Sequence, residues 1–279
     1  MAIIIPEIYK NLVTEKMKGL VKISSYAQDL GEVGNFAEEG DSITFPQFCA
    51  LSDAEILTKG DAIKTEELKQ TSTKKTVKHY CKGVSIYDID AKTGMGNFQD
   101  NAVMQQARIF AKARDKECVA DILANTLLKS STANANSITN TELDNALNLW
   151  GDEQDSDSFD AIIINSRLLP SFLSMDGFVS NTLTYTKDAN GIVRQGVVGF
   201  YRGIKIVLSD VGTYDTTANE CITFILKKQS LGVKDKKDGV DIEVSRDAEH
   251  KKDDIFADEI FVIGLIDKTG VAVVRKTIA

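Results

Sequence analysis

Three glycines stand close together in the stretch GVVGFYRGIKIVLSD, which begins at Gly196. Such glycines bind phosphate when a Gly-x-x-x-x-Gly-Lys-Ser/Thr loop opens a helix, because the N-terminal amide groups of that helix face the anion. Here Gly203 is followed by Ile204 and Lys205, and the chain continues as an apolar, strand-like run. The sequence therefore predicts no nucleotide site. We expect the glycines to serve a bend or hairpin between strands.

A second group with possible chemistry is the acidic stretch GDEQDSDSFD, residues 151–160. Clustered carboxylates hold calcium in an EF-hand, which needs Gly at the sixth loop position and Glu at the twelfth. Counted from Asp155, these positions hold Asp160 and Ser166. The stretch is therefore interpreted as a solvated loop, and a metal-dependent hydrolase built on it remains a remote alternative.

The histidine and cysteine residues give no stronger indication of a catalytic or metal-binding site. His79 and His250 are the only histidines. His79 has no acidic partner visible in the sequence, and His250 lies in the charged stretch RDAEHKKDD, which is expected at the surface. The four cysteines form no Cys-x-x-Cys pair, whereas a zinc site needs four closely placed ligands. No Gly-x-Ser-x-Gly motif occurs. We predict no catalytic, cofactor-binding or metal-binding residues, and hence a protein that is not an enzyme.

The composition is that of an ordinary globular protein. The chain has 279 residues, of which 43% are hydrophobic and 27% charged, with a formal net charge of −8. No basic stripe of the kind that grips phosphate backbones is visible, so we expect any nucleic acid to be enclosed rather than read. No signal peptide and no apolar run of about 18 residues is found, which predicts no membrane association.

The elements that would position any site begin with an amphipathic helix after Pro6, in EIYKNLVTEKMKGLVKIS. It either packs on its own domain or lies along a neighbouring molecule. From 41 to about 87 the chain alternates and is densely charged, which indicates a polar ribbon with arms longer than the usual strand of about 5–6 residues.

A lone two-stranded ribbon is marginally stable in water, so this one needs a surface to lie on. Two interpretations remain open: a solvated sheet edge protected by lysines, or a projecting arm completed by another subunit. On charge density we select seven candidate inter-subunit contact residues. They are Lys64, Glu66, Glu67, Lys69, Lys74, Lys75 and Lys78.

The strongest secondary-structure prediction is a helix from Asn97 to about Lys129, a stretch without Gly or Pro. A second helix follows the capping-box pair Thr139 and Glu142. The apolar run 159–165 predicts a strand buried on both faces, with a short helix after it. More strands follow, and the turn 267–270 predicts that the last two form a hairpin. The class is α+β, without a repeating βαβ unit.

This order of elements resembles the major capsid protein of tailed bacteriophages, which has the Hong Kong 97-type fold also used by encapsulin shells. PEIYKNLVTEKM resembles the N-terminal arm of that fold. GDSITFPQF and KKTVKHYCKGVSIYDID resemble the two sides of its extended loop, and 98–129 resembles its spine helix. FDAIIINSRLLPSFL and GVVGFYRGIKIVLSD are similar to its axial domain, and DEIFVIGLIDKTGVAVVRK to the closing hairpin of its peripheral domain.

The resemblance implies an N-terminal arm at 1–40, an extended loop at 41–90, a peripheral domain at 91–135 and 238–279, and an axial domain at 136–237. It further implies hexamers and pentamers that close an icosahedral shell around double-stranded DNA, which is not read for sequence. No long N-terminal coiled coil is present, so a separate scaffolding protein and a portal are expected. The expected location is the virion capsid, assembled in the cytoplasm of the bacterial host. An encapsulin-type compartment is the main alternative.

Overall fold

The computed structural model describes residues 6–34, 40–48, 51–52, 54, 56, 62–63, 65–180 and 196–278. Helices and strands are mixed, as the α+β class requires. The helices are α1 (Pro6–Leu20), α2 (Asp88–Thr93), α3 (Phe98–Asn125), α4 (Asn140–Leu147) and α5 (Leu169–Leu173). No helix within these ranges is long and apolar enough to cross a membrane.

The strands form two main sheets. The four-stranded sheet has the order β1 (Gln28–Glu32), β13 (Leu231–Asp247), β14 (Lys252–Leu265), β4 (Lys78–Tyr87). The seven-stranded sheet has the order β5 (Leu128–Ser131), β15 (Val271–Arg275), β12 (Thr223–Lys227), β6 (Phe159–Ile164), β9 (Ile204–Leu208), β8 (Val197–Tyr201), β7 (Phe178–Ser180). Two small antiparallel pairs are β2 (Ser42–Phe48) with β3 (Gln70–Thr76), and β10 (Tyr214–Asp215) with β11 (Glu220–Cys221).

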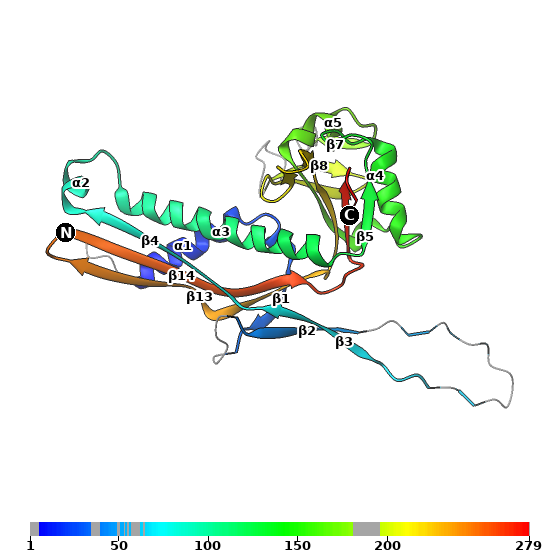
Figure 1. Cartoon of the computed structure of the whole chain (residues 1–279), viewed down its shortest axis with the longest axis horizontal. Helices are drawn as coiled ribbons and strands as arrows, with labels where there is room; N and C mark the ends of the chain where they lie inside the picture. Colours follow the sequence, from blue (N-terminus) through cyan, green and yellow to red (C-terminus); the bar gives the residue numbers. More distant parts are fainter. Residues whose placement is uncertain are drawn as a thin grey trace.

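The molecule is elongated (Figure 1). The long helix α3 runs along the four-stranded sheet, and the compact unit with the seven-stranded sheet lies at one end of that helix. The β2–β3 pair extends away from both. The shape therefore separates a body with two sheets from a projecting hairpin.

The long helix was predicted, and the structure confirms it. α3 has 28 residues, and the side chain of Asn97 caps its start by accepting hydrogen bonds from the amide groups of Gln99 and Asp100. The helix ends at Asn125, a few residues before the predicted end at Lys129. It ends there because residues 128–131 are extended as β5 and pair with β15.

The helix α1 packs on its own domain. Its buried residues Val13 and Met17 join Val103 and Phe110 of α3 and Ile242 of β13 in one hydrophobic cluster. The alternative that this helix lies free for a neighbour is therefore not what the structure shows.

A buried carboxylate fixes the chain that follows α1. Asp115 of α3 is only 2% exposed. It accepts hydrogen bonds from the amide groups of Lys22 (3.1 Å), Ile23 (3.1 Å) and Ser24 (2.9 Å), and from the Ser24 hydroxyl group (2.8 Å). Burial raises the pKa of Asp115, and these donors oppose the rise. The N-terminal segment is thus held firmly against the long helix.

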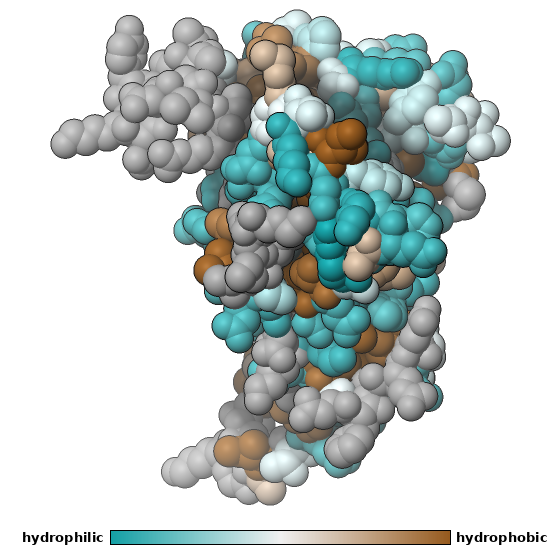
Figure 2. All heavy atoms as spheres, turned by 90° about the vertical axis from the view of Figure 1, so that its left-hand side faces the viewer, coloured by the Kyte–Doolittle hydropathy of each residue, from teal (hydrophilic) through white to brown (hydrophobic). Residues whose placement is uncertain are grey.

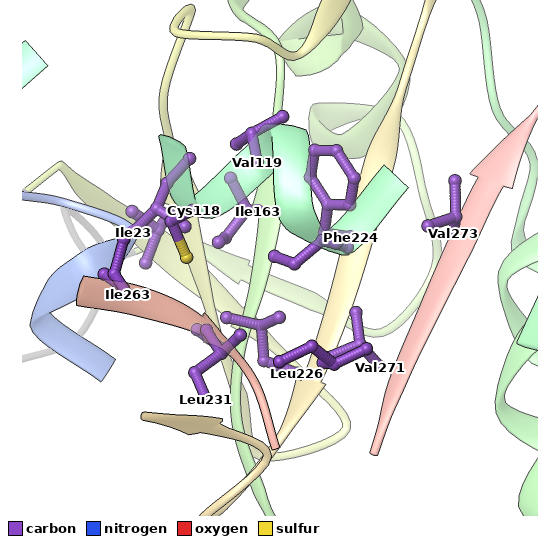
Figure 3. Packing of buried hydrophobic residues seen from close by; sticks show 14 of the residues in the cluster. Ile23, Cys118, Val119, Ile163, Phe224, Leu226, Leu231, Ile263, Val271 and Val273 are labelled. Carbon is purple, nitrogen blue, oxygen red and sulfur yellow. The ribbon is translucent and has the colours of Figure 1, made fainter. Parts of the chain in front are cut away.

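The strand β6 is buried on both faces, as its apolar run predicted. Ile163 points into a cluster with Cys118 and Val119 of α3 and Phe224 of β12 (Figure 3). Ile162 and its like-facing neighbour Ile164 join a second cluster on the opposite face, together with residues of α4 and α5. The period of two along a strand explains the division. The C-terminal half of α3 therefore joins the two sheets into one core.

The glycines of 196–203 serve a strand and its turn, as expected: Gly199 lies within β8 and Gly203 in the turn that follows. Gly203 has φ +84° and follows Arg202, which has φ +49°, in the tight turn that joins β8 to β9. A Cβ atom on Gly199 would lie 2.5 Å from the Val179 carbonyl oxygen, so the close approach of β7 requires glycine there. No helix follows, and the strand interpretation is confirmed.

The hairpin predicted for the last two strands is wrong. The turn is present, with the Gly270 amide donating to the Asp267 carbonyl at 3.1 Å. However, β14 pairs with β13 and β4, whereas β15 pairs with β12 and β5. Residues Val271 to Val274 are all buried, which suits an interior strand of the seven-stranded sheet covered on both faces.

The polar ribbon is also shorter than expected. β4 pairs with β14 along its whole length, from Lys78↔Phe261 to Tyr87↔Lys252, so residues 78–87 belong to the four-stranded sheet. The projecting part has two paired arms of seven residues each. The reason is that the returning strand finds partners in its own chain once it reaches the sheet.

Candidate subunit interface

The β2–β3 hairpin is the part of the fold with the least support from the rest of the chain. Its register runs from Ser42↔Thr76 to Phe48↔Gln70, and no third strand joins it within the described residues. In Figure 1 it extends beyond the four-stranded sheet with its far end away from the body. This geometry makes it the candidate site for contact with another subunit.

The base of the hairpin is closed by a small hydrophobic cluster. Phe45 of β2 is fully buried against Val77, Val262 and Ile266, with Val33 from the N-terminal segment. Burial of a Phe side chain contributes about 1.5–3 kcal/mol. The near end of the hairpin is therefore held by its own chain.

An ion pair strengthens the same base. The Lys75 Nζ atom of β3 lies 2.5 Å from Oδ2 and 2.7 Å from Oδ1 of Asp121 on α3, and Lys75 is only 7% exposed. The same carboxylate accepts a hydrogen bond from the Leu265 amide at 2.6 Å. A Cβ atom on Gly264 would lie 2.6 Å from Asp121 Oδ2, so glycine leaves room for this carboxylate. Lys75 thus joins the hairpin to α3 and β14, and we no longer include it among the proposed contacts.

Lys78 lies at the point where the hairpin enters the sheet. Its Nζ atom is 3.9 Å from Glu117 Oε2 of α3, and the Tyr80 hydroxyl group also donates a hydrogen bond to Glu117. Burial, followed by the hydrogen bond and the negative charge of Glu117, raises the pKa of Tyr80 to about 12. Lys78 is half exposed, and its contact with another subunit stays a prediction.

The other candidate residues lie farther along the hairpin. Glu67, Lys69 and Lys74 are exposed. The Glu66 carboxylate accepts hydrogen bonds from the Ser52 hydroxyl group at 2.5 Å and from the Ser52 amide at 2.9 Å. These two donors lower the pKa of Glu66. Lys64 is outside the described residues. Their contact with another subunit stays a prediction.

Sequence reasoning overlooked an apolar component of this loop. Leu51, Ile56, Ile63 and Leu68 are exposed by 58%, 100%, 77% and 56%. They are interspersed among the charges of LSDAEILTKGDAIKTEELK, residues 51–69, and the density of those charges led to a purely polar interpretation. The signal was present, because large apolar residues in a segment that cannot reach the core favour a contact surface.

A second exposed apolar group lies at the opposite end of the molecule. Figure 2 views the end that carries α2, where brown hydrophobic atoms lie among teal hydrophilic ones. Tyr87, Ile89 and Met95 are exposed there, beside a cleft of about 540 Å³ whose lining includes Tyr87 and Phe98. Both ends of the elongated molecule thus carry exposed apolar side chains.

The acidic loop and His79, which were candidates for a catalytic or metal site, form ion pairs at the surface of the structure. Glu153 of the acidic loop pairs with Lys227 at 2.8 Å, and no group of three or more His, Cys, Asp or Glu residues able to hold a metal occurs in the described part of the chain. His79 does have an acidic partner, contrary to expectation: its Nε2 atom lies 3.0 Å from Asp258 on β14. This pair arises because β4 lies beside β14.

Comparison with known sequences gives a relative along nearly the whole chain. The chain is 24% identical over 276 residues to the major capsid protein of Staphylococcus phage phiMR11, covering 98% of this chain and 93% of the relative. No protein-family model matches the chain. A likeness of this extent follows the complete order of elements, from α1 to β15.

Solved structures show the same fold. A structure from Gordonia phage Cozz matches with a TM-score of 0.64 and 13% identity over 92% of this chain and 86% of that one. The head structure of Helicobacter pylori bacteriophage KHP40 matches with 0.62 and 8% identity over 92% and 91%. The capsid of Cyanophage P-SCSP1u matches with 0.59 and 15% identity over 90% and 88%.

The chain therefore has the fold of phage capsid proteins, which is the Hong Kong 97-type fold that the sequence resembled. The predicted resemblance to a tailed-phage major capsid protein is confirmed as well. These findings favour the capsid interpretation over the encapsulin and hydrolase alternatives.

Proposed function

We propose that this chain is the structural shell subunit of a tailed phage and has no catalytic role. Its copies assemble as hexamers and pentamers into an icosahedral shell that encloses double-stranded DNA. The observation that carries the proposal is the 24% identity to a phage major capsid protein along 98% of the chain. The projecting β2–β3 hairpin supports the proposal from the structure. The apolar side chains at its far end, such as Ile56 and Ile63, are exposed and join no hydrophobic cluster of the described residues.

The hairpin contact rests on two kinds of interaction with different magnitudes. An exposed ion pair contributes about 0–1 kcal/mol. Full burial of a Leu or Ile side chain contributes about 1.5–3 kcal/mol, and the loop presents four such side chains. The apolar residues therefore supply most of the affinity, while Glu66, Glu67, Lys69 and Lys74 set the alignment with the neighbouring subunit.

The domain division is proposed with adjustments to the sequence prediction that follow from the two sheets. The extended loop comprises 41–77, since 78–87 pair with β14 and join the peripheral domain. β13 joins the peripheral domain from Leu231 onward, since it pairs with β14 from that residue. β5 and β15 join the axial domain, since β15 pairs with both β5 and β12. A separate scaffolding protein, a portal, assembly in the host cytoplasm and a final place in the virion capsid complete the proposal.

Electron microscopy of the purified protein tests the function, with and without a co-expressed scaffolding protein. Closed shells of uniform size are the expected result. Small oligomers under both conditions would contradict the proposal.

Two double variants test whether the apolar or the charged side chains of the hairpin contribute more to the contact. Ile56→Ser with Ile63→Ser removes apolar contact, whereas Glu66→Lys with Glu67→Lys reverses charge. Both should leave a folded subunit and impair shells, with the larger effect from the isoleucine pair. A matched control, Leu173→Ser on α5, removes an apolar side chain that is 56% exposed on the axial unit. Normal shells from both hairpin variants would refute the contact.

A further inference from the structure

The charged side chains of α3 differ in whether they have partners within the chain. Its four acidic residues all accept hydrogen bonds within the chain: Asp100 from Asn97, Asp115 from residues 22–24, Glu117 from Tyr80, and Asp121 from Lys75. The cation Arg114 is buried and paired with Asp235 and Glu259. These five side chains are therefore engaged within the fold, although Asp100 is exposed.

The three remaining cations of α3 lie on its solvent-exposed side. Arg108, Lys112 and Lys116 are exposed, and none of them forms an ion pair with a described residue. They are spaced four residues apart, so they lie on one face in steps of about 6 Å. The neutral residues Asn101 and Gln105 are also exposed and continue that side of the helix toward its N-terminus. We call Arg108, Lys112 and Lys116 the α3 stripe.

The α3 stripe places like charges next to one another. Arg108 and Lys112, and Lys112 and Lys116, are i, i+4 pairs, which modestly destabilise a helix. Asp115 stands three residues from Lys112, but its carboxylate is bonded to residues 22–24 instead. The lysines of α1, Lys10, Lys16 and Lys18, do not repeat this four-residue spacing. The stripe is hard to see in the sequence, because Arg114, Asp115 and Glu117 stand among its members, whereas the fold gives these three side chains partners within the chain.

We propose that the α3 stripe contacts the phosphate backbone of double-stranded DNA, without reading its sequence, and that this side of α3 faces the interior of the shell. The proposal rests on the proposed capsid function for its location. Charge complementarity selects the partner: a row of cations is attracted by the closely spaced negative charges of a duplex, which carries one phosphate per about 3.4 Å per strand. Side chains that reach only phosphates give no sequence preference.

The test measures binding of a mixed-sequence 30-base-pair duplex to the full-length subunit by fluorescence anisotropy at several salt concentrations. Three phosphate contacts predict a slope of log K against log salt of about −2.7, from about −0.9 for each contact. The variant Arg108→Gln/Lys112→Gln/Lys116→Gln should lose this slope and bind at least about tenfold more weakly in low salt. Gln is a good helix former, so the fold is expected to persist, and the melting temperature checks it.

The control removes the same charge from the axial unit with Lys205→Gln/Lys228→Gln/Lys268→Gln, which are exposed residues. It should retain most of the slope. The proposal is overturned if the wild type does not bind the duplex, if both variants lose binding equally, or if the stripe variant keeps the full slope.

Shell formation is scored separately, by electron microscopy of the same proteins. The stripe variant is expected to form shells. If it alone fails to form them while its duplex binding is unchanged, the stripe contacts protein and the proposal is overturned. If no protein forms shells but the slope is lost as expected, the capsid function fails while the phosphate contact stands.

Discussion

The seven-stranded sheet and the β2–β3 hairpin place their apolar side chains in opposite environments. In the sheet, Ile162 and Ile163 on adjacent positions of β6 are both fully buried, one on each face. In the hairpin loop, Ile56 is fully exposed and Ile63 is 77% exposed. The sheet therefore contributes to the stability of the single chain, whereas these loop side chains contribute little to it.

The largest effect on the sheet side is expected from Phe224→Ala. Phe224 of β12 is fully buried in the cluster that includes Cys118 and Val119 of α3, and truncation of a buried Phe costs about 3–5 kcal/mol. Urea denaturation should show this loss of unfolding free energy. A cost below about 1 kcal/mol would mean that the core is not packed as described.

The next effect concerns the base of the hairpin. Asp121→Ala removes the partner of buried Lys75 and the acceptor of the Leu265 amide, and hydrogen bonds to a charged group contribute about 1.5–3 kcal/mol. We expect a destabilisation of about that size. Lys75→Met is the matched variant: it keeps the apolar stem of Lys75 and leaves Asp121 bonded to Leu265, so it should cost less. If Asp121→Ala and the wild type had equal unfolding free energies, the pair of Lys75 and Asp121 would not hold the hairpin on α3.

Local patterns in the sequence predicted local structure well. The helix α3 followed from its lack of Gly and Pro, and the capping box of Thr139 and Glu142 is formed at the start of α4. The turn at Asp267 was also correct, but it did not determine the partner of β15, because strand pairing depends on residues far away in sequence. Local sequence patterns therefore predict individual helices, strands and turns, but they do not predict which strands pair in a sheet.

The site shows the same limit. Lys75 was chosen for an intermolecular role on charge density alone, but its partner Asp121 is 46 residues away and became visible only when α3 was placed beside β3. The exposed Ile56 and Ile63 were overlooked for the opposite reason, since their charged neighbours concealed them. Composition does not reveal which side chains the fold covers.

A smaller effect is expected from Tyr80→Phe, near the entry of the hairpin into the sheet. Loss of the hydrogen bond to Glu117 should cost about 1 kcal/mol at neutral pH. The pKa of Tyr80 is raised to about 12, above the value of about 10 in an unfolded chain. The stability that the neutral phenol contributes is thus complete below pH about 10 and is lost as the pH rises toward 12. Denaturation at several pH values should show a smaller difference between the variant and the wild type at pH 12 than at pH 8. A constant difference would contradict this assignment.

The smallest effect on stability is expected at the far end of the hairpin. Glu66→Lys with Glu67→Lys changes two exposed side chains and removes the solvent-exposed hydrogen bonds that Glu66 accepts from Ser52, so the unfolding free energy should fall by less than about 1 kcal/mol. Shell yield should nevertheless fall. A large destabilisation of the isolated subunit would show that these residues serve the chain's own fold, and the contrast between the two regions would then be lost.

Hydrogen–deuterium exchange of residues 65–72, compared between the isolated subunit and the assembled shell, tests the central claim most directly. These residues lie beyond the base that Phe45 and Lys75 hold on the body. Their amides should exchange quickly in the subunit, where no third strand among the described residues joins the hairpin, and slowly in the shell, while β6 is protected in both. Equal exchange of the hairpin in subunit and shell would contradict the claim that a neighbouring copy covers it.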